Sequence, residues 1–292
     1  MLAILDPVLA PLVGSWRLLS ARATFSDTGE CVEPFGPQPN GHMVLSPGGR
    51  ITFLITRPDR RPPADDAERA ALYDSMIACS GRVRLDAPGR FVTTVDISLI
   101  PSEVGREKSR CFTVDGDRLT IRSDKQVTRR GVGRETEAEL TWVRELPTGA
   151  ADFALLSGSW SLLSMGFTFT DTQERIEPRG PDPSGCLVLA PSGRIMVLFT
   201  RSHRQPPAND AERANLFNDV MAYTGLIRLD GTGCFITSVD GAANPSWTGE
   251  QTRLFAIDQD RLTIRTNPQA VPLFPGRLVV SDILFVREHS IA

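Results

Sequence analysis

Several features that indicate a membrane protein, a secreted protein or a nucleic-acid partner are missing from this sequence of 292 residues. No apolar run approaches the length that crosses a bilayer. The N-terminal stretch has no basic region and is interrupted by Asp6 and Pro7, so it does not resemble a signal peptide. The net charge of -3 gives no electrostatic footprint for nucleic acid or for an anionic membrane. We expect a cytoplasmic protein that has neither as a partner.

The sequence also lacks the short motifs of common cofactors and catalytic sites. No GxGxxG, no GxxxxGK followed by Ser or Thr, no GxSxG and no HExxH occurs. Their absence excludes the usual nucleotide, phosphate-loop, serine-hydrolase and zinc-protease sites. The three histidines lie in unrelated places, and no cysteine pair has the spacing of metal ligands. We therefore expect no metal and no other cofactor.

What the sequence does contain is an internal duplication. Gly14-Ser15-Trp16 returns as Gly158-Ser159-Trp160, and the chain matches itself at a shift of 144, and later of 143, as far as Glu145. Roughly two in five aligned positions are identical, and the period is far too long for a solenoid unit. We expect two similar domains, residues 1–146 and 155–292, joined by a linker at 147–154. So short a linker favours packing of the two domains on each other, and a homodimer is compatible with it.

The cysteines do not follow the duplication. They form an odd set, and none aligns with another cysteine when the two halves are overlaid; they are Cys31, Cys79, Cys111, Cys186 and Cys234. A secreted disulfide framework would have been copied with the repeat. The thiols therefore indicate a reducing compartment.

Each copy is expected to form an antiparallel barrel of eight strands with one helix, so the fold class is all-β. The strands of copy one are predicted to begin at residue 14 and to continue at 42–45, 50–57, 82–86, 91–99, 106–114, 118–123 and 134–145. The stretch 33–41 and its twin 177–185 are too rich in proline and glycine for a regular element. We expect each to be a long loop across one mouth of its barrel.

The helix of each copy is predicted at residues 64–78 and 208–223, where apolar residues recur at helical spacing after a pair of prolines. Gly81 and Gly225 are expected to end the two helices. The strand at 50–57 is apolar on both faces, so one face meets the barrel interior and the other needs a cover. We expect the helix to supply that cover.

Several of these segments resemble the lipocalin-like domain family of bacteria and fungi. They are the Gly-Ser-Trp opening, the hairpins Pro47-Gly48-Gly49-Arg50 and Pro191-Ser192-Gly193-Arg194, the helix exit Tyr223-Thr224-Gly225, the loop Pro245-Ser246-Trp247-Thr248-Gly249 and the strand Asp260-Arg261-Leu262-Thr263-Ile264. The resemblance covers nearly the whole chain, once per copy, and it implies a barrel with a cavity for a ligand. Some barrels of this general kind, found beside biosynthetic enzymes, resemble cofactor-free cyclases of Diels-Alder type, which is an analogy of fold and context.

Copy one departs from the family pattern at two positions, since Cys79 and Glu103 stand where copy two has Tyr223 and Trp247. If these aromatic residues line a cavity, copy two has kept the family pocket, and copy one has either lost it or changed what it holds. The sequence leaves open whether the cavity lies within a barrel or between the two barrels.

Four arginines on strands are the main candidate site residues: Arg57, Arg110, Arg201 and Arg253. Either they lie on outward faces and pair with carboxylates, or they point inward and bind a carbonyl, enolate or carboxylate oxygen of a ligand. We predict three catalytic residues, Tyr223, Arg253 and Arg201. The predicted ligand-binding residues are Trp247, Asn244, Phe255, Phe199, His42, Arg57 and Arg110.

Each of the other candidates has a structural alternative. Tyr223 either packs on a strand or donates a hydrogen bond to a ligand carbonyl. Trp247 is either a lid over the barrel mouth or an exposed edge, and the lone His42 is either a structural residue or an acid/base in barrel one. The charge-rich segment Glu103–Lys108 is expected to be solvated surface.

Two functions are open, and a third is weaker. The first is a cofactor-independent enzyme of specialised metabolism that cyclises or isomerises a hydrophobic molecule by folding it and polarising one carbonyl. The second is a non-catalytic binder or carrier of a small apolar molecule, since a closed eight-stranded barrel is about the size to hold one. The third is a scaffold whose two barrels serve assembly. The enzyme is favoured because copy two keeps all the candidate donors whereas copy one has lost two.

Overall fold

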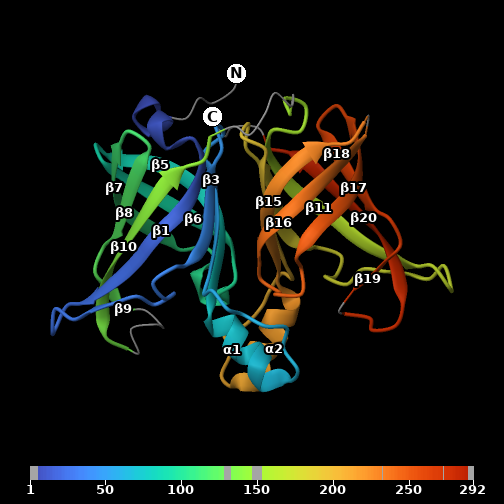
Figure 1. Cartoon of the computed structure of the whole chain (residues 1–292), viewed down its shortest axis with the longest axis horizontal. Coiled ribbons are helices and arrows are strands. Elements are labelled where there is room, and N and C mark those ends of the chain that lie inside the picture. Colours follow the sequence, from blue (N-terminus) through green and yellow to red (C-terminus); the bar gives the residue numbers. More distant parts are fainter. Residues whose placement is uncertain (1–5, 128–132, 147–152, 232, 272, 289–292) are drawn as a thin grey trace.

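The computed structural model describes residues 6–127, 133–146, 153–231, 233–271 and 273–288, and these form two antiparallel barrels that lie side by side (Figure 1). In barrel 1 the strands are β1 (Gly14–Phe25), β2 (Cys31–Val32), β3 (Asn40–Leu45), β4 (Arg50–Thr56), β5 (Met76–Ala87), β6 (Arg90–Ser98), β7 (Glu107–Asp115), β8 (Arg118–Ser123), β9 (Gln126–Val127) and β10 (Glu135–Arg144). In barrel 2 they are β11 (Gly158–Phe169), β12 (Arg175–Ile176), β13 (Ser184–Leu189), β14 (Arg194–Thr200), β15 (Met221–Leu229), β16 (Cys234–Ala242), β17 (Gly249–Asp258), β18 (Arg261–Thr266), β19 (Gln269–Ala270) and β20 (Leu278–Arg287).

Each barrel is closed by its first long strand. β1 pairs with β3 on one side and with β10 on the other, and β11 pairs in the same way with β13 and β20. Eight long strands complete each ring, while the two-residue strands β2, β9, β12 and β19 sit at the ends of the strand order. The predicted all-β class and the two tandem barrels are confirmed. Residues 147–152 of the predicted linker lie outside the described residues.

The opening Gly-Ser-Trp of each copy ties the first strand to the turn before it. Trp16 is fully buried, and its indole Nε1 donates a hydrogen bond of 2.9 Å to the carbonyl of Leu12, at the end of the 3-10 turn Pro7–Leu12. Trp160 repeats the contact with Leu156 at 2.8 Å. An arginine from the last strand stacks over each indole, which closes this end of the barrel with a cation–π contact.

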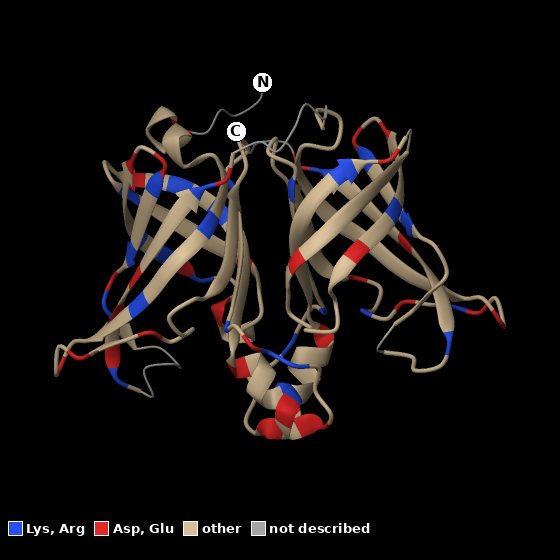
Figure 2. Cartoon of the chain, in the orientation of Figure 1, with Lys and Arg blue, Asp and Glu red and all other residues tan. Residues whose placement is uncertain are grey.

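The helices α1 (Asp66–Asp74) and α2 (Asp210–Asp219) are shorter than predicted. Each begins with a capping box: Asp65 accepts from the Glu68 amide at 2.9 Å, while Glu68 accepts from the Ala64 amide at 2.7 Å. Acidic residues gather at the tips of both helices, where the helix dipole favours negative charge (Figure 2). The two helices pack on each other below the gap between the barrels (Figure 1).

The prediction that Gly81 and Gly225 end the helices is wrong. Both glycines lie inside strands, β5 and β15, at points where the pairing register shifts. A Cβ atom there would collide with the backbone oxygen of the facing strand, so the glycines permit a bulge and a close approach. The predicted helices therefore extend too far toward the C-terminus, and Tyr223 belongs to strand β15.

The cover over the outer faces of β4 and β14 also differs from the prediction. The outer face of β4 packs mainly against β15 and β16 of barrel 2, that of β14 packs against β5 and β6 of barrel 1, and the helices cover only one end of this interface. The buried residues of this shared cluster include Val44, Leu54, Val188, Met196, Leu198, Leu72 and Phe217. The two barrels are therefore joined by a continuous apolar contact, as the short linker led us to expect.

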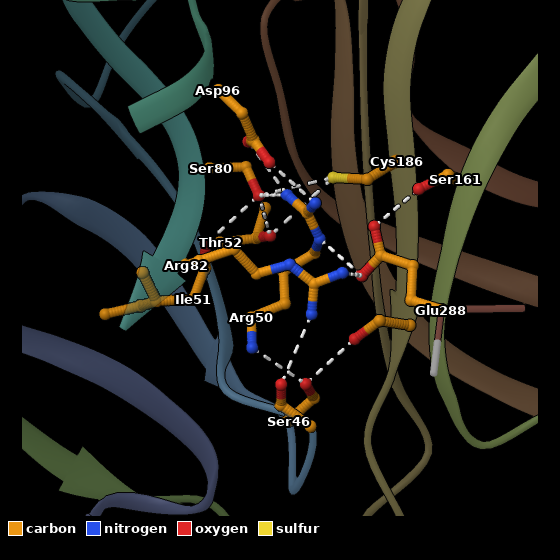
Figure 3. A network of polar contacts seen from close by, with 12 residues as sticks. Ser46, Arg50, Ile51, Thr52, Ser80, Arg82, Asp96, Ser161, Cys186 and Glu288 are labelled. Atoms are coloured by element: carbon orange, nitrogen blue, oxygen red, sulfur yellow. Dashed lines mark hydrogen bonds and ion pairs between the residues drawn. The ribbon is translucent and has the colours of Figure 1, made fainter. Parts of the chain in front are cut away.

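Polar contacts repeated in both copies also join the two repeats, and Figure 3 shows those around Arg50 and Glu288. Arg50, from the first Pro-x-Gly-Arg hairpin, bonds Asp96 of its own barrel at 2.7 Å and Glu288 of the other copy at 2.6 Å. Arg194 in barrel 2 likewise bonds Asp240 of its own barrel and Glu145 of the first copy, each at 2.6 Å. The hairpin arginines therefore hold the two repeats together.

The segment between β4 and β5, and its twin between β14 and β15, cross to the opposite barrel. We call these segments, residues 57–75 and 201–220, arm 1 and arm 2. Arg60 of arm 1 donates to the carbonyls of Ala242 and Ala243 at the end of β16. Arg204 of arm 2 donates to the carbonyls of Ser98 and Leu99 at the end of β6. Each arm is thus anchored on the rim of the other barrel.

Candidate ligand-binding site

A cavity of about 580 Å³ lies inside barrel 1. Its walls are mostly apolar and include Met43, Phe53, Ile77, Phe91, Leu140 and Trp142. The volume falls within the range of about 300–1,000 Å³ that is usual for small-molecule sites. The sequence left open whether the cavity lies within a barrel or between the two barrels. Most of the wall of this cavity belongs to barrel 1, so it lies within the barrel of copy one.

Barrel 1 is hollow because five large side chains of copy two are replaced by smaller or polar ones. At corresponding positions, barrel 2 has Met165, Phe167, Phe199, Tyr223 and Trp247 where barrel 1 has Ala21, Ala23, Ile55, Cys79 and Glu103. The first four of the barrel 2 residues are buried in one core cluster, and Trp247 packs against that cluster. The rings of Tyr223 and Trp247 meet edge to face, with centroids 5.8 Å apart. The sequence assigned the pocket to copy two on the condition that Tyr223 and Trp247 line a cavity, whereas the structure packs both against the core of barrel 2.

Three cationic residues on one strand face enter this cavity. Lys108 and Arg110 alternate at the start of β7 and so share a face, Arg106 directly precedes this strand, and all three line the cavity. Lys108 forms an ion pair of 2.5 Å with Glu103, and the two side chains are only 19% and 30% exposed. The expectation that this segment is solvated surface is wrong for these two residues.

Arg110, unlike Lys108, has no ion pair with a carboxylate among the described residues. Its Nη1 donates to the carbonyl of Ser109 at 2.9 Å, and within the described ranges no side chain accepts a hydrogen bond from it or forms an ion pair with it. Burial lowers the pKa of Arg110 below its ordinary value, since desolvation disfavours the charged form. An arginine nevertheless stays protonated at neutral pH. Its guanidinium is thus a positive charge in an apolar cavity with donors to spare.

The corresponding arginine in barrel 2 is better satisfied. Arg253 also donates to its neighbouring carbonyl, that of Thr252, and in addition its Nη2 donates to the Gln251 side-chain oxygen at 3.3 Å. Lys108 stands in place of Gln251 in barrel 1, and an ammonium group has no acceptor. The difference between Gln251 and Lys108 therefore leaves Arg110 without a side-chain acceptor and adds a second cation beside it.

Arg57 and Arg201 do not point inward as predicted. Both side chains are exposed; Arg57 donates to the Pro34 carbonyl at 3.1 Å, and Arg201 pairs with Asp219 at 3.0 Å. They follow the last residues of β4 and β14, so the inward and outward alternation of the strands does not extend to them. Neither residue lines the cavity.

His42 faces the other barrel and not the cavity. It is buried, with Nδ1 3.4 Å from the Glu145 carboxylate and Nε2 3.7 Å from that of Asp240. In copy two its position is taken by Cys186, whose thiol meets Thr52 and Ser80 across the same interface. The predicted acid/base role for His42 in barrel 1 is therefore wrong in its geometry.

The remaining predicted residues belong to barrel 2 and are absent from the cavity walls. Phe199 and Tyr223 are buried in the core cluster, and Phe255 packs against it. The Asn244 side chain accepts a hydrogen bond of 2.9 Å from the Ser246 amide, which makes it a turn residue beside Trp247. Of the ten predicted site residues, the cavity of barrel 1 contains Arg110 alone.

Sequence reasoning did not select Lys108, Glu103, Thr93 and Ser123 as site residues, although they are among the polar groups that line the cavity. One signal was present in the sequence. Strand alternation places Arg106, Lys108 and Arg110 on the same face as Phe112. A second signal was the repeated replacement of large apolar residues of copy two by small ones in copy one. Both signals become visible when the two copies are compared face by face.

A closed barrel with an interior cavity is consistent with the binding of a small molecule. The lipocalin-like domain family matches residues 13–145 and again residues 157–284, so the chain belongs to this family as a tandem duplication. A search among curated proteins finds no match.

Two solved structures share a distant likeness. A protein of unknown function of the DUF3598 family from Nostoc punctiforme is 12% identical, with 96% of this chain and 98% of that chain covered and a TM-score of 0.26. A mutant of transferrin binding protein B from Haemophilus parasuis is 6% identical, with 89% and 63% covered and a TM-score of 0.25. Neither likeness supports a functional conclusion.

The described residues contain no group of three or more histidine, cysteine or acidic residues placed to hold a metal ion. In the same part of the chain, no helix is long and apolar enough to cross a membrane.

Proposed function

We propose that barrel 1 binds a small, mainly apolar molecule that carries one anionic group, and that Arg110 receives this group. The observation that carries the proposal is the unpaired guanidinium of Arg110 inside an apolar cavity. A buried charge without a partner is costly, and a carboxylate would supply the missing acceptors through a bidentate, charge-assisted pair. Lys108 and Arg106 on the same face add to the positive potential that attracts an anion.

The apolar walls supply the rest of the binding free energy. Residues such as Phe53, Ile77 and Trp142 remove the hydrocarbon part of a ligand from water, which is worth about 0.8 kcal/mol for each buried methylene. A ligand with one charged end and an apolar body satisfies both parts of the cavity. A neutral hydrocarbon would leave Arg110 without an anionic partner.

Binding without catalysis is the function that the cavity supports. The cyclase or isomerase hypothesis depended on Tyr223 and Arg253 as donors in an open pocket, whereas both residues are buried in barrel 2 and neither lines the cavity. The alternative that the sequence left open, a binder or carrier of a small apolar molecule, needs only the cavity and its charge. We therefore favour the carrier, with an anionic group added to its ligand.

The test compares two probes of equal chain length, dodecanoate and dodecan-1-ol, by isothermal titration calorimetry. We expect dodecanoate to bind at least about tenfold more tightly, because charge-assisted hydrogen bonds contribute roughly 1.5–3 kcal/mol. Arg110→Met should remove this preference, while the matched variant Arg253→Met in barrel 2 should keep it. Equal affinities of the wild-type protein for the two probes, or no binding of dodecanoate, would overturn the proposal.

A further inference from the structure

We infer that arm 2 of the second repeat completes the ligand site of barrel 1. In this arrangement Pro206, Pro207 and Arg213 form the outer wall of the cavity and contact the apolar end of the ligand. The inference rests on the proposed function, since it concerns the same cavity and the same anionic ligand. It goes further in two ways. It states the orientation of the ligand, and it assigns to arm 2 of the second repeat the selection of ligands by the length of their hydrocarbon chain.

The first observation is the composition of the cavity wall. Pro206, Pro207 and Arg213 line the cavity of barrel 1, although all three belong to the second repeat. The same cavity is lined by Ser98, the last residue of β6, and by Ile100, which follows this strand. One barrel therefore encloses only part of its own site, and the other repeat supplies the remainder.

The second observation is that arm 2 is fixed in this place by specific contacts. Arg204 donates to the carbonyls of Ser98 and Leu99, so that the arm is bonded to the rim of barrel 1 just before its two prolines. Two residues of arm 1 reach the same region: Tyr73, fully buried, lines the cavity, and Asp74 lies 3.7 Å from the Arg213 Nε. The wall formed by arm 2 is thus a part of the packed structure.

The third observation is the chemistry of this wall. Proline has no amide hydrogen, so Pro206 and Pro207 present apolar surface without a donor. Arg213 does contribute a charge, but Asp210 and Asp74 accompany it and neutralise it. The outer wall therefore suits hydrocarbon, in contrast to the inner face of β7.

The position of Arg110 fixes the direction of the ligand. Arg106 stands at the rim, directly after the loop that follows β6, and Arg110 lies four residues further along β7. At about 3.3 Å per residue, this places Arg110 roughly 13 Å inward along the strand. An anion held by Arg110 therefore has its charged group inside the barrel, and its chain extends outward to arm 2.

The experiment measures how affinity depends on chain length. Wild-type protein is titrated with octanoate, decanoate, dodecanoate and tetradecanoate, and we expect the affinity to rise about fourfold per added methylene that is buried. The double variant Pro206→Ser, Pro207→Ser should weaken tetradecanoate by about tenfold and leave octanoate unchanged, because only the longer chain reaches arm 2. The matched double variant Pro62→Ser, Pro63→Ser in arm 1 should leave the whole series unchanged.

A second variant guards against an effect of folding alone. Arg204→Gln removes the anchor of arm 2 from the rim of barrel 1, and it should flatten the chain-length profile in the same way, whereas Arg60→Gln should not. Equal weakening of all four acids, or no change for tetradecanoate in either arm 2 variant, would overturn the inference. That result differs from failure of the proposed function, in which the wild-type protein itself fails to bind the acids in preference to alcohols.

Discussion

Arg110 and Arg253 occupy equivalent inward positions on β7 and β17. Of the two, only Arg253 donates a hydrogen bond to a side chain, from Nη2 to the Gln251 oxygen at 3.3 Å. Lys108 takes the place of this glutamine in barrel 1 and pairs instead with Glu103. One substitution between the copies therefore separates a satisfied structural arginine from one that is available to an anion.

The variant Lys108→Gln tests this relationship directly. It should supply Arg110 with the acceptor that Arg253 has and remove one cation from the cavity. We expect dodecanoate to bind about tenfold more weakly, a change of about 1.4 kcal/mol, in a calorimetric titration. The reciprocal change Gln251→Lys should leave binding unaltered and lower the free energy of unfolding by about 1 kcal/mol, because Arg253 loses its acceptor. Unchanged dodecanoate affinity in Lys108→Gln would contradict the assignment.

Restoring one large side chain should close the cavity. The variant Cys79→Tyr introduces the residue of the second copy at a position that lines the cavity. We expect dodecanoate binding to be lost, with the melting temperature unchanged or higher, because the ring fills existing space. The opposite change, Tyr223→Cys, should destabilise barrel 2 by about 2–4 kcal/mol because it leaves a void in a packed core. Full dodecanoate affinity in Cys79→Tyr would show that the probe binds elsewhere.

The duplication and the barrels were accessible from the sequence, whereas the location of the open barrel was not. Strand alternation and turn residues are local, and they predicted seven of the eight long strands closely; β5 alone begins earlier, at Met76. Whether an inward residue such as Tyr223 lines a cavity or fills it depends on the residues that face it across the barrel. In barrel 2 the ring of Tyr223 packs edge to face on Trp247 and is buried in the same cluster as Met165 and Phe167.

The interface between the barrels was equally hard to predict in detail. The Pro-x-Gly-Arg hairpins were visible as turns, but the partners of Arg50 and Arg194 come from positions nearly 240 and 50 residues away. Nothing in the local pattern distinguishes such an arginine from an exposed one. The same limit explains why His42 was assigned to the barrel interior, since both faces of β3 are buried.

Glu288 should be the most sensitive residue of this interface. Its carboxylate is only 3% exposed and accepts from Arg50 at 2.6 Å, from Ser161 at 2.5 Å and from Arg82 at 2.9 Å (Figure 3). We expect Glu288→Gln to lower the free energy of unfolding by about 3–5 kcal/mol, because the buried Arg50 loses one of its two carboxylate partners and Arg82 loses its ion pair. Chemical denaturation measures this change.

The control for the Glu288 prediction is Glu139→Gln, which removes a carboxylate from an exposed pair with Arg122. An exposed pair contributes at most about 1 kcal/mol, so this variant should unfold almost as the wild type does. If Glu288→Gln were equally silent, the contacts of Glu288 would contribute nothing measurable to the attachment of the two barrels.

The other interface carboxylate, Glu145, should make stability depend on acid pH. Burial alone would raise the pKa of Glu145, but hydrogen bonds from His42 and Arg194 outweigh burial and lower the pKa to about 2. A carboxyl group with a depressed pKa stabilises the folded state above its unfolded pKa of 4.5, and that contribution is lost as the pH falls toward 2. The full contribution is up to about 3 kcal/mol for a group whose side chain is 15% exposed. We therefore expect chemical denaturation of the wild type and of Glu145→Gln to show a large difference in the free energy of unfolding at pH 6. This difference should narrow steadily as the pH falls from 4.5 to 2. A difference that stays constant across this range would mean that Glu145 has the same pKa in the folded and the unfolded protein.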